Sequence, residues 1–84
     1  MRFQACELTD DDLMAMYRKG DADAFDTLFD RHYAAVYNFA RRMLLDSHRA
    51  EDVLQETFLA VMRTAEHYPS KGFFRTWLLR ICRS

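Results

Sequence analysis

The sequence predicts an all-α fold, a compact bundle of about four helices, from three observations. Half of the 84 residues are hydrophobic, and the chain holds two glycines and one proline, so few positions suit turns. Apolar side chains recur at spacings of three and four residues over several stretches. Alternating runs typical of strands do not occur in the sequence. A chain of this length makes one domain with a modest core.

Capping residues delimit the first two predicted helices. Thr9 precedes three aspartates, a pattern typical of an N-cap followed by acids that the helix dipole favours. Gly20 ends this short helix. Asp21 can cap a second helix, which runs to about Leu45 and carries a long apolar stripe. We expect residues 1–8 to form a loose arm.

The third and fourth predicted helices flank a loop. Ser47 is the expected cap of the third helix, which covers about residues 48–67. This helix stops before Pro69, because the residue that precedes a proline disfavours helical geometry. Residues 69–72 have the composition of a loop. The fourth helix begins at about Phe73 and has an apolar and a cationic side.

The third helix has two unlike faces. One is broadly apolar and suits a helix that faces the core. The opposite face carries two carboxylates, an amide and a guanidinium around an exposed leucine: Asp52, Gln55, Glu56, Leu59 and Arg63. A leucine surrounded by acids is suited to docking on a basic partner. A solvated face with one isolated leucine is the alternative interpretation.

Charge is distributed unevenly along the chain. Residues 1–30 hold eight acids and three bases, whereas residues 67–84 hold four cations and no acid. Aromatic side chains lie among these cations, which suits single-stranded nucleic acid because bases stack on rings while cations follow the phosphates. Core packing is the alternative for Phe74, Trp77 and Ile81, which share one helical face.

The residues that could carry chemistry form no recognisable site. No carboxylate is placed beside a nucleophile and no phosphate-binding glycine loop occurs, so we expect no enzymatic activity. Cys6 and Cys82 lie at opposite ends and are expected to be reduced; with His32, His48 and His67 they share no metal-ligand spacing, so we expect neither metal nor cofactor. We expect His32 to be a hydrogen-bonded histidine within the apolar stripe. A membrane span and a signal peptide are absent, so a cytoplasmic location is expected.

Four motifs carry a resemblance to a known family: Gly20-Asp21-x-x-Ala24-Phe25-x-x-Leu28, Arg31-x-Tyr33, Ala50-Glu51-Asp52-Val53-Leu54-Gln55-Glu56-Thr57-Phe58 and Phe74-Arg75-Thr76-Trp77-Leu78-x-Arg80-Ile81. In these motifs the chain resembles the second conserved region of bacterial RNA polymerase sigma factors, specifically the extracytoplasmic-function (ECF) group, over residues 11–84. The resemblance implies a domain that binds core RNA polymerase. It also implies that the domain recognises and helps to melt the promoter −10 element for transcription initiation.

The resemblance also implies roles for individual residues. Asp52, Gln55 and Glu56, with Leu59 beside them, would face the clamp helices of the β′ subunit. The loop before the fourth helix would form a pocket for a base flipped out of the non-template single strand, and the start of that helix would flank the strand. The implied DNA-binding residues are Tyr68, Ser70, Lys71, Gly72, Phe73, Arg75, Thr76, Arg80, Arg83 and Ser84. An anti-sigma factor is a further expected partner.

The chain departs from the family pattern at its end. The loop is about one residue shorter than is common, and Ser84 stands where the family usually has asparagine. The family's downstream helix-turn-helix domain is absent from this sequence, so we expect residues 1–84 to be a fragment that holds one domain. Two other classes of function stay open. One is a sigma-like module that binds polymerase or an anti-sigma factor without DNA; the other is a metal or redox sensor that uses the cysteines and histidines.

Overall fold

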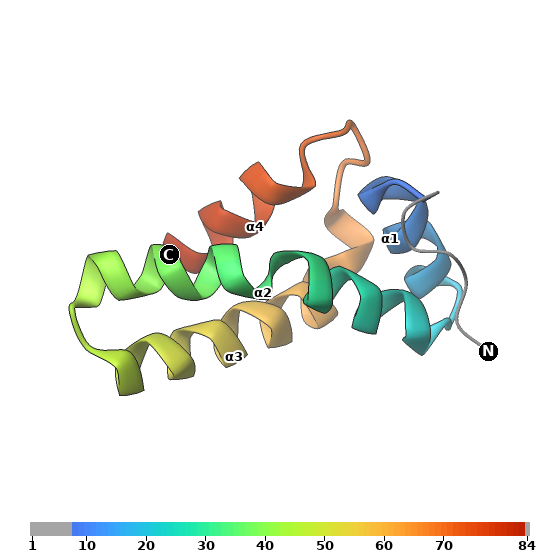
Figure 1. Cartoon of the computed structure of the whole chain (residues 1–84). Helices are drawn as coiled ribbons and strands as arrows, with labels where there is room; N and C mark the ends of the chain where they lie inside the picture. Colours follow the sequence, from blue (N-terminus) through green and yellow to red (C-terminus); the bar gives the residue numbers. More distant parts are fainter. Residues whose placement is uncertain (1–7, 84) are drawn as a thin grey trace.

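The computed structural model describes residues 8–83, which form four α-helices and one short 3-10 helix (Figure 1). The elements are α1 (Asp10–Arg18), α2 (Ala22–Leu44), α3 (Ser47–Thr64), η2 (Ala65–His67) and α4 (Phe74–Arg83). The predicted all-α bundle of about four helices is confirmed. The predicted loose arm lies outside the described residues except for its last member, Leu8, and Cys6 and Ser84 also lie outside them.

The predicted caps of α1 and α2 are confirmed. The Thr9 hydroxyl accepts a hydrogen bond from the Asp12 N–H at 3.0 Å, and the Asp12 carboxylate accepts one from the Thr9 N–H at 3.1 Å. This reciprocal pair satisfies two backbone donors that the helix itself leaves unpaired. Gly20 has a φ of 105°, which suits a residue without Cβ, and Asp21 accepts from the Asp23 N–H at 3.0 Å.

The predicted cap of α3 is wrong by one residue. Asp46 is the N-cap, with an extended backbone and a carboxylate that accepts from the N–H groups of His48 and Arg49 at 2.9 and 3.2 Å. Ser47 is the first helical residue. Both residue types suit an N-cap, so composition alone could not choose between them. The last turn before Tyr68 tightens into η2 instead of continuing as α-helix.

The long helices α2 and α3 form an antiparallel hairpin, on which α1 and α4 pack (Figure 1). α1 covers the end where α2 begins and α3 stops, and α4 lies beside the second half of α2. Phe58 of α3 joins the two long helices, because its ring centroid lies 4.8 Å from Phe29 and 6.0 Å from Phe25. The fully buried large side chains are Leu13, Met14, Leu28, Val36, Val61, Phe74 and Leu78.

The turn between α2 and α3 contains an unfavourable residue. Leu45 adopts the left-handed conformation, with a φ of 56°, and its side chain is 86% exposed. A side chain with a Cβ pays about 1–2 kcal/mol in this conformation, and glycine is the usual residue at such a helix end. The exposed side chain gains little from packing, so the turn is strained without compensation from the core.

Replacing Leu45 with glycine is expected to stabilise the chain. The Leu45→Gly change removes the Cβ clash, and after the entropy cost of glycine in the unfolded chain we expect a gain of about 0.5–1 kcal/mol in the free energy of unfolding. Denaturant unfolding of the 84-residue chain measures the difference. Leu45→Ala is the matched control, because it removes the exposed side chain but keeps Cβ. A gain as large for alanine as for glycine would show that backbone strain is not the cause.

Candidate nucleic-acid and protein interfaces

The outer face of α3 is exposed as the spacing predicted: it holds Asp52, Gln55, Glu56, Leu59 and Arg63, and Met62 belongs to the same face. The side chains of Leu59 and Met62 are 44% and 45% exposed. Met62 was missed in the sequence, although its spacing of three from Leu59 placed it on the same face. The face therefore holds two neighbouring apolar side chains, and three polar ones precede them along the helix. An apolar pair of this kind fits protein docking better than a single leucine does.

The loop between η2 and α4, residues 69–73, lies at the surface. Ser70, Lys71, Gly72 and Phe73 are all exposed, and the Phe73 side chain reaches 67% exposure. Ser70 and Gly72 both have positive φ values, 56° and 81°. The loop lies next to α1 (Figure 1). It presents an exposed aromatic residue, an exposed cation and two residues with positive φ.

Tyr68 lies beneath this loop instead of on it. It is 4% exposed, and its ring centroid lies 5.5 Å from that of Phe74 and 5.0 Å from that of Trp77. Its hydroxyl donates a hydrogen bond to the Asp11 carboxylate. Burial raises the pKa of Tyr68, and this hydrogen bond adds to the effect. In this position the ring supports the loop and is not available for a base to stack on.

The exposed side of α4 is cationic. Arg75, Thr76, Arg80 and Arg83 are exposed, whereas Phe74 on the opposite side is 2% exposed and belongs to the core. The core alternative is confirmed for Phe74, and Trp77 and Ile81 are partly buried against the same cluster. A hollow between α2 and α4 is lined by Phe39, Thr76, Leu79, Arg80 and Arg83. The loop leads directly into α4, and the exposed residues of the loop and of this side of α4 make up the candidate nucleic-acid surface.

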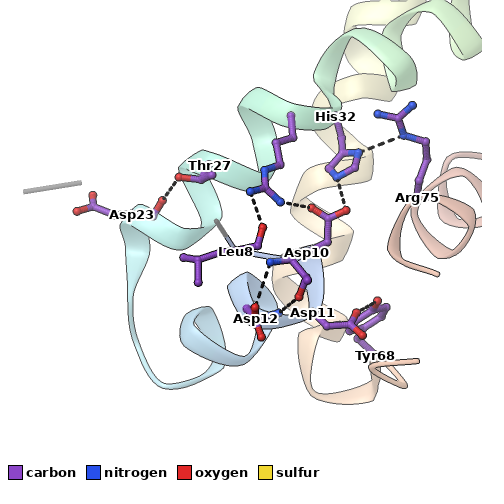
Figure 2. Close-up of polar contacts among 11 residues, drawn as sticks. Leu8, Asp10, Asp11, Asp12, Asp23, Thr27, His32, Tyr68 and Arg75 are labelled. Carbon is purple, nitrogen blue, oxygen red and sulfur yellow. Dashed lines mark hydrogen bonds and ion pairs between the residues drawn. The ribbon is translucent and has the colours of Figure 1, made fainter. Parts of the chain in front are cut away.

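Asp10 of α1 connects that helix to α2. Its carboxylate accepts from Arg31 Nη1 at 2.9 Å and bonds His32 Nε2 at 2.9 Å (Figure 2). Arg31 also donates to the Leu8 carbonyl at 2.6 Å. His32 is 4% exposed, and the expectation of a hydrogen-bonded histidine within the apolar stripe is confirmed.

His32 also accepts a hydrogen bond from a residue of α4. Arg75 Nε donates to His32 Nδ1 at 3.3 Å (Figure 2). The Asp10 carboxylate can only accept, so Nε2 carries a proton, and a neutral ring leaves Nδ1 as an acceptor for Arg75. Burial lowers the pKa of His32 below its ordinary value of 6.5; the charges of Arg75 and Arg31 also lower it, and Asp10 acts in the opposite direction. The neutral ring therefore holds an exposed arginine of the candidate interface.

Three further observations concern other candidate chemistry. Cys82 is a buried free cysteine, and burial raises the pKa of its thiol, which disfavours the reactive thiolate. Within residues 8–83, no three His, Cys, Asp or Glu side chains are grouped so that they could hold a metal ion. No helix of that part of the chain is long and apolar enough to cross a membrane.

Comparison with known proteins supplies the family. The family model described as sigma-70 region 2 matches residues 28–84, which is more than half of the chain. The chain belongs to this sigma factor family. The match includes the outer face of α3, the loop and α4, so both candidate surfaces lie within the family's conserved region.

Curated relatives narrow the group to ECF sigma factors. The chain is 43% identical over 68 residues to the RNA polymerase sigma factor CarQ of Myxococcus xanthus, covering 81% of this chain and 39% of that protein. It is 38% identical over 64 residues to the ECF sigma factor SigW of Bacillus subtilis, a match that covers 76% of this chain and 34% of that protein. It is 36% identical over 75 residues to the ECF sigma factor SigM of Mycobacterium tuberculosis, a match that covers 89% of this chain and 38% of that protein. The chain thus spans less than two fifths of each relative. No solved structure matches it.

The buried histidine predicts a pH dependence of stability. Because the pKa of His32 is lower in the folded state, the unfolded chain takes up a proton below about pH 6.5 that the folded chain does not. The free energy of unfolding should therefore fall as pH is lowered from about 7 toward 5. The groups that face the ring are Asp10, Arg31 and Arg75.

Denaturant unfolding across this pH range, for the wild-type chain and for His32→Gln, isolates the contribution of the histidine. Glutamine can hydrogen-bond but does not titrate, so the His32→Gln chain should lose less stability on acidification. The other titrating groups are common to both chains and cancel in the difference. Parallel curves for the two chains would show that His32 does not carry the dependence.

Proposed function

We propose that this chain is the domain of an ECF sigma factor that binds core RNA polymerase and recognises the melted −10 element of a promoter. The observation that carries the proposal is the separation of two exposed surfaces within the region that the family model matches. The outer face of α3 combines acids with two apolar side chains, and the surface made by the loop and α4 is cationic. Two surfaces of opposite character suit two different partners.

The outer face of α3 is the proposed polymerase-binding surface. Asp52, Gln55 and Glu56 would contact basic side chains of the clamp helices in the β′ subunit, and Leu59 would pack between helices. Helix-on-helix docking is favoured when an exposed helix presents anchors at spacings of three and four residues. An anti-sigma factor that covered this face would exclude core polymerase, which fits regulation by competition.

The loop and α4 form the proposed DNA surface. Extrusion of a base from its stack costs a few kcal/mol, which stacking and phosphate contacts must offset. Phe73 offers an exposed ring for stacking, and Lys71 lies two residues before it. Arg75, Arg80 and Arg83 line the adjoining helix, where phosphates of the displaced strand would pass. The place of action would be the cytoplasm, where core polymerase works.

Charge reversal on α3 tests the polymerase surface. Glu56→Lys should weaken binding of the 84-residue chain to purified core polymerase by about tenfold, because it places a cation against a basic surface. Asp26→Lys is the matched control: it reverses an exposed acid on α2 and should leave the affinity unchanged. Circular dichroism checks that both variants remain helical. Equal affinities for wild type and Glu56→Lys would contradict the assignment.

Two kinds of substitution test the DNA surface. A preferred single-stranded oligonucleotide is first selected from a randomised pool and compared with its scrambled version at low salt. Arg83→Ala should weaken binding to both sequences alike and reduce the salt dependence by about one phosphate contact. Phe73→Ala should weaken binding to the preferred sequence by about tenfold and to the scrambled one less, because stacking on one ring is lost.

The same titrations separate the proposed function from the protein-interaction alternative. A sigma-like module without DNA recognition would bind core polymerase normally and would bind neither oligonucleotide. Selection of no preferred sequence, or loss of affinity on Phe73→Ala that is the same for both sequences, would rule out the base-recognition part of the proposal.

A further inference from the structure

The loop before α4 is held mainly by another helix. Its residues belong to no helix or strand, and two of them, Ser70 and Gly72, have positive φ values. The amide of Gly72 bonds to a side chain of α1, the Asp11 carboxylate, at 2.8 Å. Ordering an irregular segment of this kind costs conformational entropy at each residue, so contacts from outside the segment decide which conformation it adopts.

Asp11, in the first turn of α1, bonds both to the loop and to the residue that precedes it. One carboxylate oxygen accepts from the Tyr68 hydroxyl (Figure 2). The other accepts from the Gly72 amide. Tyr68 is in turn fixed by its ring contacts with Phe74 and Trp77. Gly72 of the loop and Tyr68, the buried residue before the loop, are thereby held on a single carboxylate.

Arg18, in the last turn of α1, donates hydrogen bonds to η2, to Tyr68 and to the loop. Its Nη1 donates to the carbonyl of Ala65 at 3.2 Å and to that of Tyr68 at 3.3 Å, and its Nη2 donates to the Ser70 hydroxyl at 3.0 Å. Ala65 is the first residue of η2 and its carbonyl also accepts from the Tyr68 N–H at 3.3 Å, so the Arg18 bonds reinforce the connection between η2 and Tyr68. They also hold Ser70 where its backbone is in the left-handed region.

We propose that Asp11 and Arg18 of α1 are positioning residues that set the conformation of the loop and thereby select the base it accepts. The inference rests on the proposed function, because it assigns a cause to the base preference of that surface. Discrimination between bases requires donors, acceptors and ring faces to be fixed before the base arrives, and a loosely held loop would accommodate several bases. Neither side chain needs to touch DNA for this role.

Base selectivity tests the proposal. For each variant, affinity is measured for the preferred oligonucleotide and for oligonucleotides that differ from it at one position, and their ratio gives the discrimination. Asp11→Ala and Arg18→Ala should each lower the discrimination at the pocket position by about fivefold or more, the low end of what one good base contact supplies. The salt dependence should not change, because no phosphate contact is removed.

Asp12→Ala is the matched control on the same helix. It removes the carboxylate half of the capping box of α1, and the capping-box hydrogen bonds of Asp12 go to Thr9 and not to the loop. Its discrimination should equal that of the wild-type chain. A loss as large for Asp12→Ala as for Asp11→Ala, or no loss for Asp11→Ala and Arg18→Ala, would overturn the proposal.

Amide exchange provides a readout that is independent of DNA. The Gly72 amide should exchange faster in Asp11→Ala than in the wild-type chain, with α4 amides unchanged, and unchanged exchange at Gly72 would overturn the proposal whatever the chain binds. If Asp11→Ala does not fold, Tyr68→Phe removes one of the two bonds to Asp11 and keeps the ring packing, and the same loss of discrimination is expected. A wild-type chain without base preference but with faster Gly72 exchange in Asp11→Ala would refute the proposed function and leave the loop-positioning role in place.

Discussion

Three successive carboxylates at the start of α1 bond in three different directions, and the arrangement of the other elements depends on them. Asp12 caps the N-terminus of α1 itself, Asp11 bonds to the loop before α4, and Asp10 bonds to Arg31 and His32 of α2. An α-helix turns by about 100° per residue, so neighbouring positions necessarily face different elements. One short helix can therefore position both the long hairpin and the irregular segment.

The same bonds explain how an acidic N-terminal segment coexists with a cationic surface. Asp10 forms an ion pair with Arg31, so part of the negative charge of that segment is compensated inside the fold. Asp11 accepts from two neutral donors, the Tyr68 hydroxyl and the Gly72 amide. The outer face of α3 and the cationic side of α4 are each exposed. Because exposed charges act on solutes over roughly a Debye length of about 10 Å, the placement of the charges matters more for binding than the net charge of −1.

Two adjacent phenylalanines at the start of α4 differ in burial. Phe74 is the first residue of α4, is 2% exposed, and packs against Tyr68 and Trp77, whereas Phe73 precedes the helix and is 67% exposed. Tyr68, Phe74 and Trp77 form a packed aromatic cluster, and Phe73 lies in the irregular segment next to it in the chain. The packed rings limit how far the loop can move, and the bonds of the loop to α1 restrict it further.

The sequence by itself determined the helices, most of their ends and the exposed faces, because apolar periodicity and capping are local properties of a few neighbouring residues. Asp52 and Leu59 could be placed on an outer face from spacing alone. The tertiary structure alone decided the roles of Tyr68, Asp11 and Arg18, since their bonds join residues more than forty positions apart. The sequence around an aromatic residue beside a loop does not show whether its ring points outward or inward. The packing of α1 against η2 makes the inward position of Tyr68 favourable.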